Sequence, residues 1–134
     1  MNRYVTDTHP MIWALSDDPR LSSPAKSVFV EADTGKAIII IPPIVIVEMI
    51  YLSEKGRIPL HLVDDFMNKI AQLGRSYRLT LLGKAVIKAL RQIPRDQIPE
   101  MPDRIIAATA KAYNCPLITR DGMITSFGAV AVLW

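Results

Sequence analysis

Cysteine and histidine are scarce in this sequence, which limits the covalent and metal chemistry that it can support. The chain contains one cysteine and two histidines. A single cysteine cannot form an internal disulfide, which is typical of proteins in a reducing compartment. His9 and His61 stand alone, and neither a CxxC nor an HExxH pattern occurs, so a zinc site is not indicated.

The sequence also lacks an apolar run long enough to cross a membrane. The longest run, Ile38–Leu52, is interrupted by Pro42–Pro43 and by Glu48, and it is shorter than the roughly 20 residues that a spanning helix needs. Near the start, Arg3 is followed by the polar pair Thr6–Asp7 and not by the apolar stretch of a secretory signal. We therefore expect a cytoplasmic protein.

The composition is that of one globular domain, which we expect to span residues 1–134. The apolar fraction is 50% and the charged fraction is 22%, which excludes a disordered chain. The length is sufficient for one substantial core. The net charge of +3 and the pI of about 9.2 permit an anionic partner such as nucleic acid, although many proteins carry such a charge only for solubility.

Strands and helices alternate along the chain, which predicts an α/β domain with a mainly parallel sheet. The expected strands are Tyr4–Thr6, Ile38–Ile41, Tyr77–Leu82, Pro116–Thr119 and Ala129–Trp134. The expected helices cover residues 8–15, 22–33, 44–54, 61–73, 83–90 and 102–114. The segment Ile44–Val47 would also suit a strand, because a short apolar run does not distinguish the two.

Three acids lie where such a sheet presents its chemistry. Asp7 follows the first strand, Asp121 follows a later strand, and Asp103 lies in the first turn of an alanine-rich helix. Parallel strands end at one edge of the sheet and the following helices begin there, so these carboxylates can converge. Close carboxylates repel each other unless a hard cation lies among them, and Mg²⁺ or Mn²⁺ suits oxygen ligands. Such a site favours metal-assisted hydrolysis of phosphodiester bonds.

A structural explanation remains open for these acids at this stage. Asp7 could simply cap the helix that follows it. Glu48 is the only charged residue within Ile44–Leu52, and a buried carboxylate without a partner is costly. Glu48 therefore points outward, pairs with an arginine such as Arg104, or faces a shared cation.

Basic residues are candidates for holding a polyanion near the acids. Lys84, Lys88 and Arg91 are spaced to line one face of a helix, either as a phosphate-binding stripe or as a solvated face. Arg104 and Arg120 adjoin acids in the sequence, and we expect them to be electrostatic partners of those acids. The helical stripe is therefore the better candidate for contact with phosphate.

Three segments together resemble the PIN-domain ribonucleases, and closely the VapC-type toxins of type II toxin–antitoxin pairs. The segments are YVTDTHPMIWAL followed by PRLS, then IVIVEMIYLSEKGRI, then PDRIIAATAKAYNCPLITRD, and they cover nearly the whole chain. The resemblance implies a three-layer α/β/α sandwich around a parallel sheet, with an acidic Mg²⁺ or Mn²⁺ site. It also implies endoribonuclease activity on an RNA substrate and inhibition by a small cognate antitoxin. With the high apolar fraction, it leads us to expect an apolar groove that the antitoxin covers, and a homodimer.

Matched motif by motif, the resemblance assigns the acidic site to four residues, which are Asp7, Glu48, Asp103 and Asp121. Close relatives often have an aspartate where this chain has Glu100, which makes Glu100 an accessory candidate with a longer side chain. A histidine that many relatives have shortly before this motif is missing from Pro94–Pro99. Thr119 could add a hydroxyl to the site, or it could be an ordinary strand threonine.

Other functions of α/β domains fit the acids less well. A receiver-type phosphoacceptor needs an acidic pair after the first strand and a lysine late in the sheet. A haloacid-dehalogenase-type phosphatase needs Asp-x-Asp after the first strand. The chain has Asp7–His9, which reads Asp-Thr-His, at the first position and Arg120–Asp121 at the late one. The remaining alternative is a non-catalytic binding module whose acids only cap helices.

Overall fold

Five strands form one parallel sheet in the computed structural model, which describes residues 1–134. The strands are β1 (Asn2–Thr6), β2 (Ala37–Ile41), β3 (Tyr77–Leu79), β4 (Leu117–Ile118) and β5 (Val132–Leu133). Their order across the sheet is β3-β2-β1-β4-β5, and every neighbouring pair is parallel. The first strand is therefore the central one.

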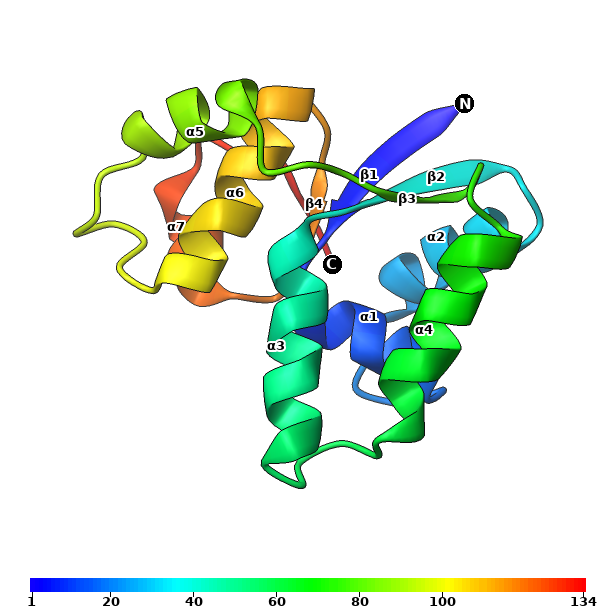
Figure 1. Cartoon of the computed structure of the whole chain (residues 1–134). Coiled ribbons are helices and arrows are strands. Elements are labelled where there is room, and N and C mark those ends of the chain that lie inside the picture. Colours follow the sequence, from blue (N-terminus) through cyan, green and yellow to red (C-terminus); the bar gives the residue numbers. More distant parts are fainter.

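Helices cover both sides of the sheet and complete a three-layer α/β/α sandwich, as expected. They are α1 (Thr8–Leu15), α2 (Ser23–Asp33), α3 (Pro43–Glu54), α4 (His61–Gln72), α5 (Lys84–Arg91), α6 (Met101–Tyr113) and α7 (Gly122–Phe127). Helices α1 to α4 gather on one side and α5 to α7 on the other (Figure 1). None of these helices is both long and apolar enough to span a membrane.

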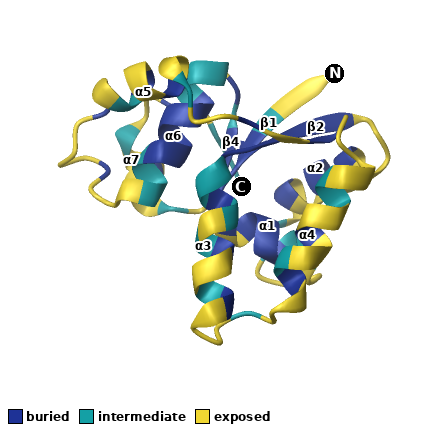
Figure 2. Cartoon of the chain, in the orientation of Figure 1, coloured by how far each residue is buried: buried dark blue, intermediate teal, exposed yellow.

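The core is built around β2 and α6. All residues of β2, which reads AIIII, are buried, as is typical of a parallel strand covered on both faces. In α6 the small side chains Ala107, Ala108 and Ala110 are fully or almost fully buried, so the helix backbone can pack closely against its neighbours. Asn114 ends α6 in the left-handed conformation, with a φ of 51°. Figure 2 shows this buried centre and the exposed outer faces of α3, α4 and α5.

Some element boundaries differ from the sequence-based prediction. The third strand ends at Leu79 instead of Leu82, because Leu81 and Leu82 leave the sheet and are largely exposed. The last strand is limited to Val132–Leu133. The segment Ile44–Val47 is helical, as part of α3. Helix α7 is an element that the sequence reading did not predict.

The order of the strands creates a crevice beside the end of β1. The chain leaves β1 towards β2, whereas it leaves β4 towards β5, on the other side of β1. Loops at such a point diverge and leave space at the carboxyl edge of the sheet. The pairing of Thr6 with Ile118 brings the two strand ends together there. Asp7 continues this pairing, since its backbone N–H donates to the Ile118 carbonyl at 3.0 Å.

Candidate active site

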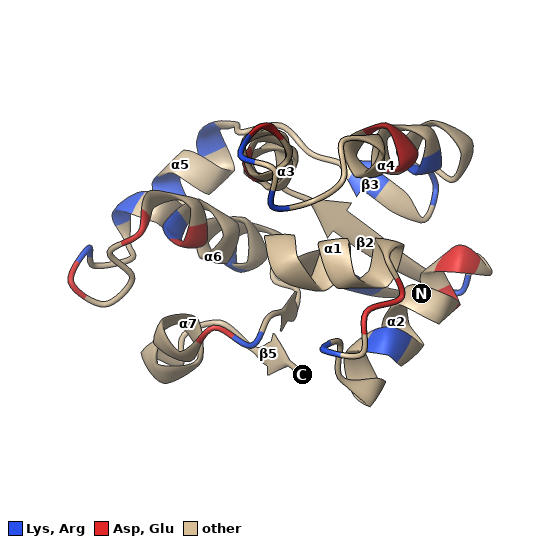
Figure 3. Ribbon diagram, turned by 90° about the horizontal axis from the view of Figure 1, so that it is seen from below, with Lys and Arg blue, Asp and Glu red and all other residues tan.

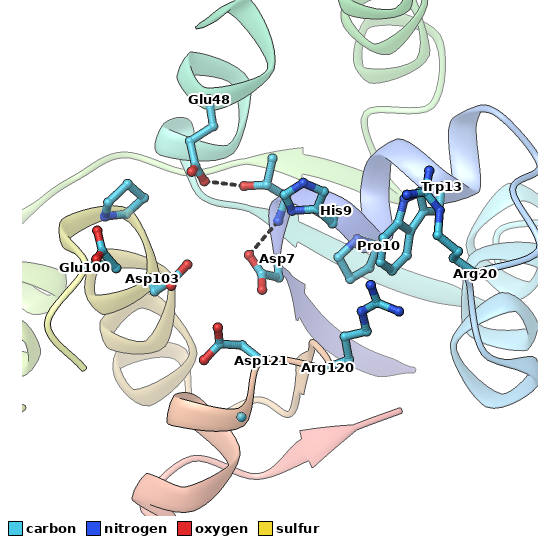
Figure 4. Close-up of a pocket in the computed structure, with 13 residues that line it drawn as sticks. Asp7, His9, Pro10, Trp13, Arg20, Glu48, Glu100, Asp103, Arg120 and Asp121 are labelled. Carbon is cyan, nitrogen blue, oxygen red and sulfur yellow. Dashed lines mark hydrogen bonds between the residues drawn. The ribbon is translucent and has the colours of Figure 1, made fainter. Parts of the chain in front are cut away.

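A cleft of about 650 Å³ opens at this edge of the sheet, and only one of its 13 lining residues is hydrophobic. The four acids expected at the site all line it (Figure 4). They come from four different elements or their caps. The full lining is Asp7, Thr8, His9, Pro10, Trp13, Arg20, Glu48, Glu100, Pro102, Asp103, Arg120, Asp121 and Gly122. Thr119 is fully buried and does not line the cleft.

Asp7 is held rigidly at the end of β1. Its Oδ1 accepts a hydrogen bond from the Thr8 backbone N–H at 2.7 Å, which makes Asp7 the N-cap of α1. Its Oδ2 accepts a hydrogen bond from the Thr119 hydroxyl at 2.7 Å. Asp7 therefore does cap the helix, and it also faces the cleft. Thr8 is the first residue of α1.

Asp121 is placed by the same threonine. The backbone N–H of Asp121 donates to the Thr119 hydroxyl oxygen at 3.0 Å. The Asp121 side chain caps α7, since Oδ1 accepts from the Ile124 backbone N–H at 2.9 Å. One buried hydroxyl thus links the two acids across neighbouring strands, so Thr119 orients these acids without reaching the cleft itself.

Glu48 turns into the cleft from α3. Its Oε1 accepts a hydrogen bond from the Thr8 hydroxyl (Figure 4). The alternatives of an outward side chain and of a pair with Arg104 are both wrong. The Arg104 guanidinium instead donates to the backbone carbonyls of Ile93 and Leu90, at 3.0 and 3.1 Å. These carbonyls lie at and after the end of α5, where free helix acceptors need partners.

Asp103, in the first turn of α6, has the most strongly raised pKa of the acids in the cleft. Burial, followed by the charges of the other acids around the cleft, raises its pKa to about 7. Burial is also the main cause that raises the pKa of Asp7 and of Glu48 above their usual values. The fold thus holds carboxylates together at a cost, as in sites where a cation offsets their repulsion.

The donor set of the cleft suits a hard cation. It consists of carboxylates and the Thr8 hydroxyl, with no thiolate, and His9 is its only imidazole. Asp7 keeps lone pairs free, because each of its oxygens accepts one hydrogen bond. No three carboxylates or imidazoles are arranged as a preformed ligand cluster. The chemistry fits an ion, provided that Glu48 and Asp103 reorient towards the fixed Asp7.

Two arginines line the wall of the cleft opposite Glu48 and Asp103, and the sequence reading missed their arrangement. Arg120 lies over the Trp13 ring with its guanidinium carbon 4.4 Å from the ring centroid, and Arg20 lies at 5.0 Å. Arg120 forms no ion pair with an acid, so the predicted role of electrostatic partner is wrong. The only available signal was the presence of an aromatic residue in the helix after Asp7.

The predicted basic stripe lies elsewhere. Lys84, Lys88 and Arg91 are exposed on α5, and none of them lines the cleft. Viewed from below, the basic residues of α5 lie well apart from the segment that leads into α7 (Figure 3). Glu100, the accessory candidate, is exposed at the N-cap of α6 and does line the cleft.

Comparison with known proteins agrees with this architecture. A chain of the VapBC2 complex from Rickettsia felis, in a crystal structure bound to a DNA fragment from its promoter, superposes with a TM-score of 0.69. The match covers 98% of this chain and 97% of that chain at 15% sequence identity, which establishes a shared fold. No curated protein has significant sequence similarity to this chain. The sequence matches the PIN domain family over residues 4–130. With nearly its whole length matched, the chain belongs to the PIN domain family.

Proposed function

We propose that this protein is a metal-dependent endoribonuclease that acts as the VapC-type toxin of a toxin–antitoxin pair. The observation that supports this most is the convergence of Asp7, Glu48, Asp103 and Asp121 on one polar cleft. Two of them, Glu48 and Asp103, cap no helix, yet they share this cleft, where burial and the neighbouring acids raise the pKa of Asp103 to about 7. PIN domains are generally nucleases, which supports phosphodiester hydrolysis as the reaction of this cleft.

In this proposal the same four carboxylates hold Mg²⁺ or Mn²⁺, with Glu100 as an accessory at the rim. The ion would supply an activated water and neutralise charge that develops on the phosphate. The chain contributes the orientation of its ligands. Thr119 holds Asp7 and the backbone of Asp121, and the Thr8 hydroxyl holds Glu48. Asp103 needs no hydrogen-bonded partner in this role, because the ion stabilises its ionised form.

A toxin of this type needs an antitoxin, and the similarity to a chain of the VapBC2 complex supports a protein partner. The outer face of α3 offers apolar side chains to such a partner or to a second copy of the chain. Val47, Ile50 and Tyr51 are exposed there by 43%, 39% and 59%. We expect a homodimer in light scattering and a growth defect when the chain is produced in the cytoplasm without its antitoxin. A stable monomer would argue against the dimer, and unimpaired growth would argue against the toxin.

The alternative is a non-catalytic binding module whose acids serve as helix caps. This explanation has support, since Asp7 caps α1 and Asp121 caps α7. It does not explain Glu48 or Asp103. Glu48 lies in the middle of α3, and Asp103, in the first turn of α6, lies among acids that together with burial raise its pKa to about 7. We therefore favour the nuclease.

RNA cleavage distinguishes these two functions directly. Purified protein is incubated with end-labelled single-stranded RNA and Mn²⁺ or Mg²⁺, then with EDTA, and then with excess metal restored. The nuclease predicts cleavage that EDTA abolishes and metal restores, and that Asp103→Asn removes. Cleavage that persists in EDTA indicates a contaminant or a metal-independent enzyme, and no cleavage of any RNA favours the binding module. The preparation of Asp103→Asn is the control for contamination, because it passes through the same purification.

A further inference from the structure

The wall of the cleft opposite Glu48 and Asp103 is organised around one indole ring. Trp13 is only 3% exposed, and its ring contacts Arg120, Arg20 and the edge of Trp134. His9 lies nearby, with its ring centroid 5.7 Å from that of Trp13. A ring covered in this way has no free face on which a nucleotide base could stack. Trp13 therefore affects the cleft through the arginine side chains that pack on its ring.

The two arginines on this ring differ in what their N–H groups contact. Arg20 forms a two-pronged pair with Asp18, with Nε to Oδ1 at 3.1 Å and a terminal nitrogen to Oδ2 at 2.7 Å. This pair lowers the pKa of Asp18 to about 2, so both partners stay charged and neutralise each other. Arg120 forms no hydrogen bond and no ion pair with the protein, although its guanidinium is stacked in place.

The backbone around Arg120 is fixed on both sides. Thr119 is fully buried and bonded to Asp7, and Asp121 caps α7. Arg120 therefore extends from a rigid segment, and the indole orients its guanidinium plane. In the close-up the guanidinium lies beside Pro10 and Arg20, away from the carboxylate of Asp121 (Figure 4). The result is an oriented cation with unused donors, in the same cleft as the acids.

We propose that Arg120 binds a backbone phosphate of the RNA strand and that Trp13 is its positioning residue. This inference rests on the proposed nuclease function and names the group that admits the polyanion. An acidic cleft repels RNA, so binding needs a positive group whose donors are free. A planar guanidinium can present two parallel N–H donors to a phosphate. The cleft thus has an acidic side for the ion and a basic side for the strand.

Binding of a fluorescent single-stranded oligoribonucleotide tests this assignment. Anisotropy is measured in EDTA, which prevents cleavage, over a series of salt concentrations, with wild type, Arg120→Ala and Arg120→Lys. The matched control is Arg78→Ala, because Arg78 is an exposed arginine on β3 that does not line the cleft. A second comparison is the double variant Lys84→Ala with Lys88→Ala, which removes most of the basic stripe on α5.

Arg120→Ala should weaken binding on the order of tenfold, as expected for the loss of a charged hydrogen-bonded contact. The slope of log K against log salt should become smaller in magnitude by about 0.7, the value for one phosphate contact on a single strand. Arg120→Lys should keep the slope but recover only part of the affinity. Arg78→Ala and the double lysine variant should match wild type. An unchanged slope in Arg120→Ala overturns the assignment, as does a reduced slope in the lysine variant alone.

The positioning role of Trp13 needs a readout other than stability. Trp13→Phe keeps an aromatic face and should keep the salt slope of wild type, whereas Trp13→Leu should show a slope smaller in magnitude by about 0.7 while retaining the fold by circular dichroism. Equal slopes in the two variants contradict the positioning role. If Trp13→Leu does not fold, Trp13→Phe alone tests the positioning role. A salt slope that falls by about 0.7 in Trp13→Phe, although the aromatic ring is retained, also contradicts that role.

Failure of the inference can be told apart from failure of the proposed function. If wild type cleaves RNA with metal but Arg120→Ala keeps its KM, kcat and salt slope, the phosphate assignment alone is wrong. If wild type neither cleaves nor binds RNA, both are wrong. Mn²⁺ binding to Arg120→Ala should be equal to that of wild type or tighter, and weaker Mn²⁺ binding would show that Arg120 supports the arrangement of the acids instead of binding phosphate.

Discussion

The hydroxyl of Thr119 donates a hydrogen bond to Oδ2 of Asp7 at 2.7 Å, across 112 positions of sequence. The same hydroxyl oxygen accepts the backbone N–H of Asp121. A single buried group thus sets the relative position of two acids that end neighbouring strands. Asp7 and Asp121 are consequently held at the sheet edge, which gives the cleft a fixed pair of acids towards which Glu48 and Asp103 can reorient.

Replacing this group should damage both stability and the site. Thr119→Val has nearly the same shape but leaves Asp7 and the N–H of Asp121 without their partner. We expect the free energy of unfolding in EDTA to fall by about 1–3 kcal/mol, the cost of unpaired buried polar groups.

The control for Thr119→Val is Thr109→Val, which removes another buried hydroxyl. Thr109 donates only to the Ile105 carbonyl of its own helix, so its replacement should cost less. Urea unfolding measures both variants. Equal decreases in the free energy of unfolding would mean that the hydrogen bond between Thr119 and Asp7 stabilises the fold no more than an ordinary hydroxyl within a helix does.

The stability of the metal-free protein should depend on pH through Asp103. Its pKa is raised in the fold from 3.8 to about 7, so the folded state holds this proton more tightly than the unfolded chain does. The corresponding stability is fully present below pH 3.8 and is lost as the pH rises through 7.

Thermal unfolding of wild type and Asp103→Asn in EDTA, between pH 4 and pH 8, measures this contribution. The variant cannot ionise at this position, so its melting temperature relative to wild type should rise as the pH increases. Added Mn²⁺ should stabilise wild type most at the higher pH, where Asp103 is ionised. A difference between the two proteins that does not vary with pH would contradict the coupling.

Glu48 should be a destabilising charge in the absence of metal. Burial raises the pKa of Glu48, and the nearby charge of Asp7 raises it further. Glu48→Gln retains an oxygen that can accept from Thr8, so we expect a higher melting temperature in EDTA and a loss of RNA cleavage in Mn²⁺. Glu54→Gln, at the exposed end of the same helix, is the control and should alter neither. A lower melting temperature for Glu48→Gln would indicate that the carboxylate is structural.

Local chemistry made a large part of this arrangement predictable from the sequence. Asp7 follows an apolar strand at the start of a helix, so its place at the sheet edge follows from the geometry of parallel strands. The proline and alanines of α6 likewise predicted where Asp103 would lie. The run Ile38–Ile41 also predicted the strand β2.

Contacts between distant residues were not predictable in the same way. Arg104 and Arg120 adjoin acids in the sequence, yet one contacts backbone carbonyls and the other an indole. Which partner an arginine reaches depends on the packing of whole helices, and sequence proximity carries no such information. Thr119 shows the same limit, because its role depends on the register between β1 and β4. Helix α7 was missed because it is short and begins at a glycine.

Binding of Mn²⁺ tests the central claim, that these carboxylates form a metal site, most directly. Titration calorimetry compares metal-free wild type with Asp7→Asn. The variant can still cap α1 because asparagine is also a good N-cap, and its amide N–H can donate to the Thr119 hydroxyl oxygen in place of the bond that Oδ2 accepts. The account predicts that wild type binds Mn²⁺, that Asp7→Asn binds it at least about tenfold more weakly, and that the variant melts at an equal or higher temperature in EDTA. Equal Mn²⁺ affinity in the two proteins, or a large loss of stability in the variant, would show that Asp7 is a structural cap and not a metal ligand.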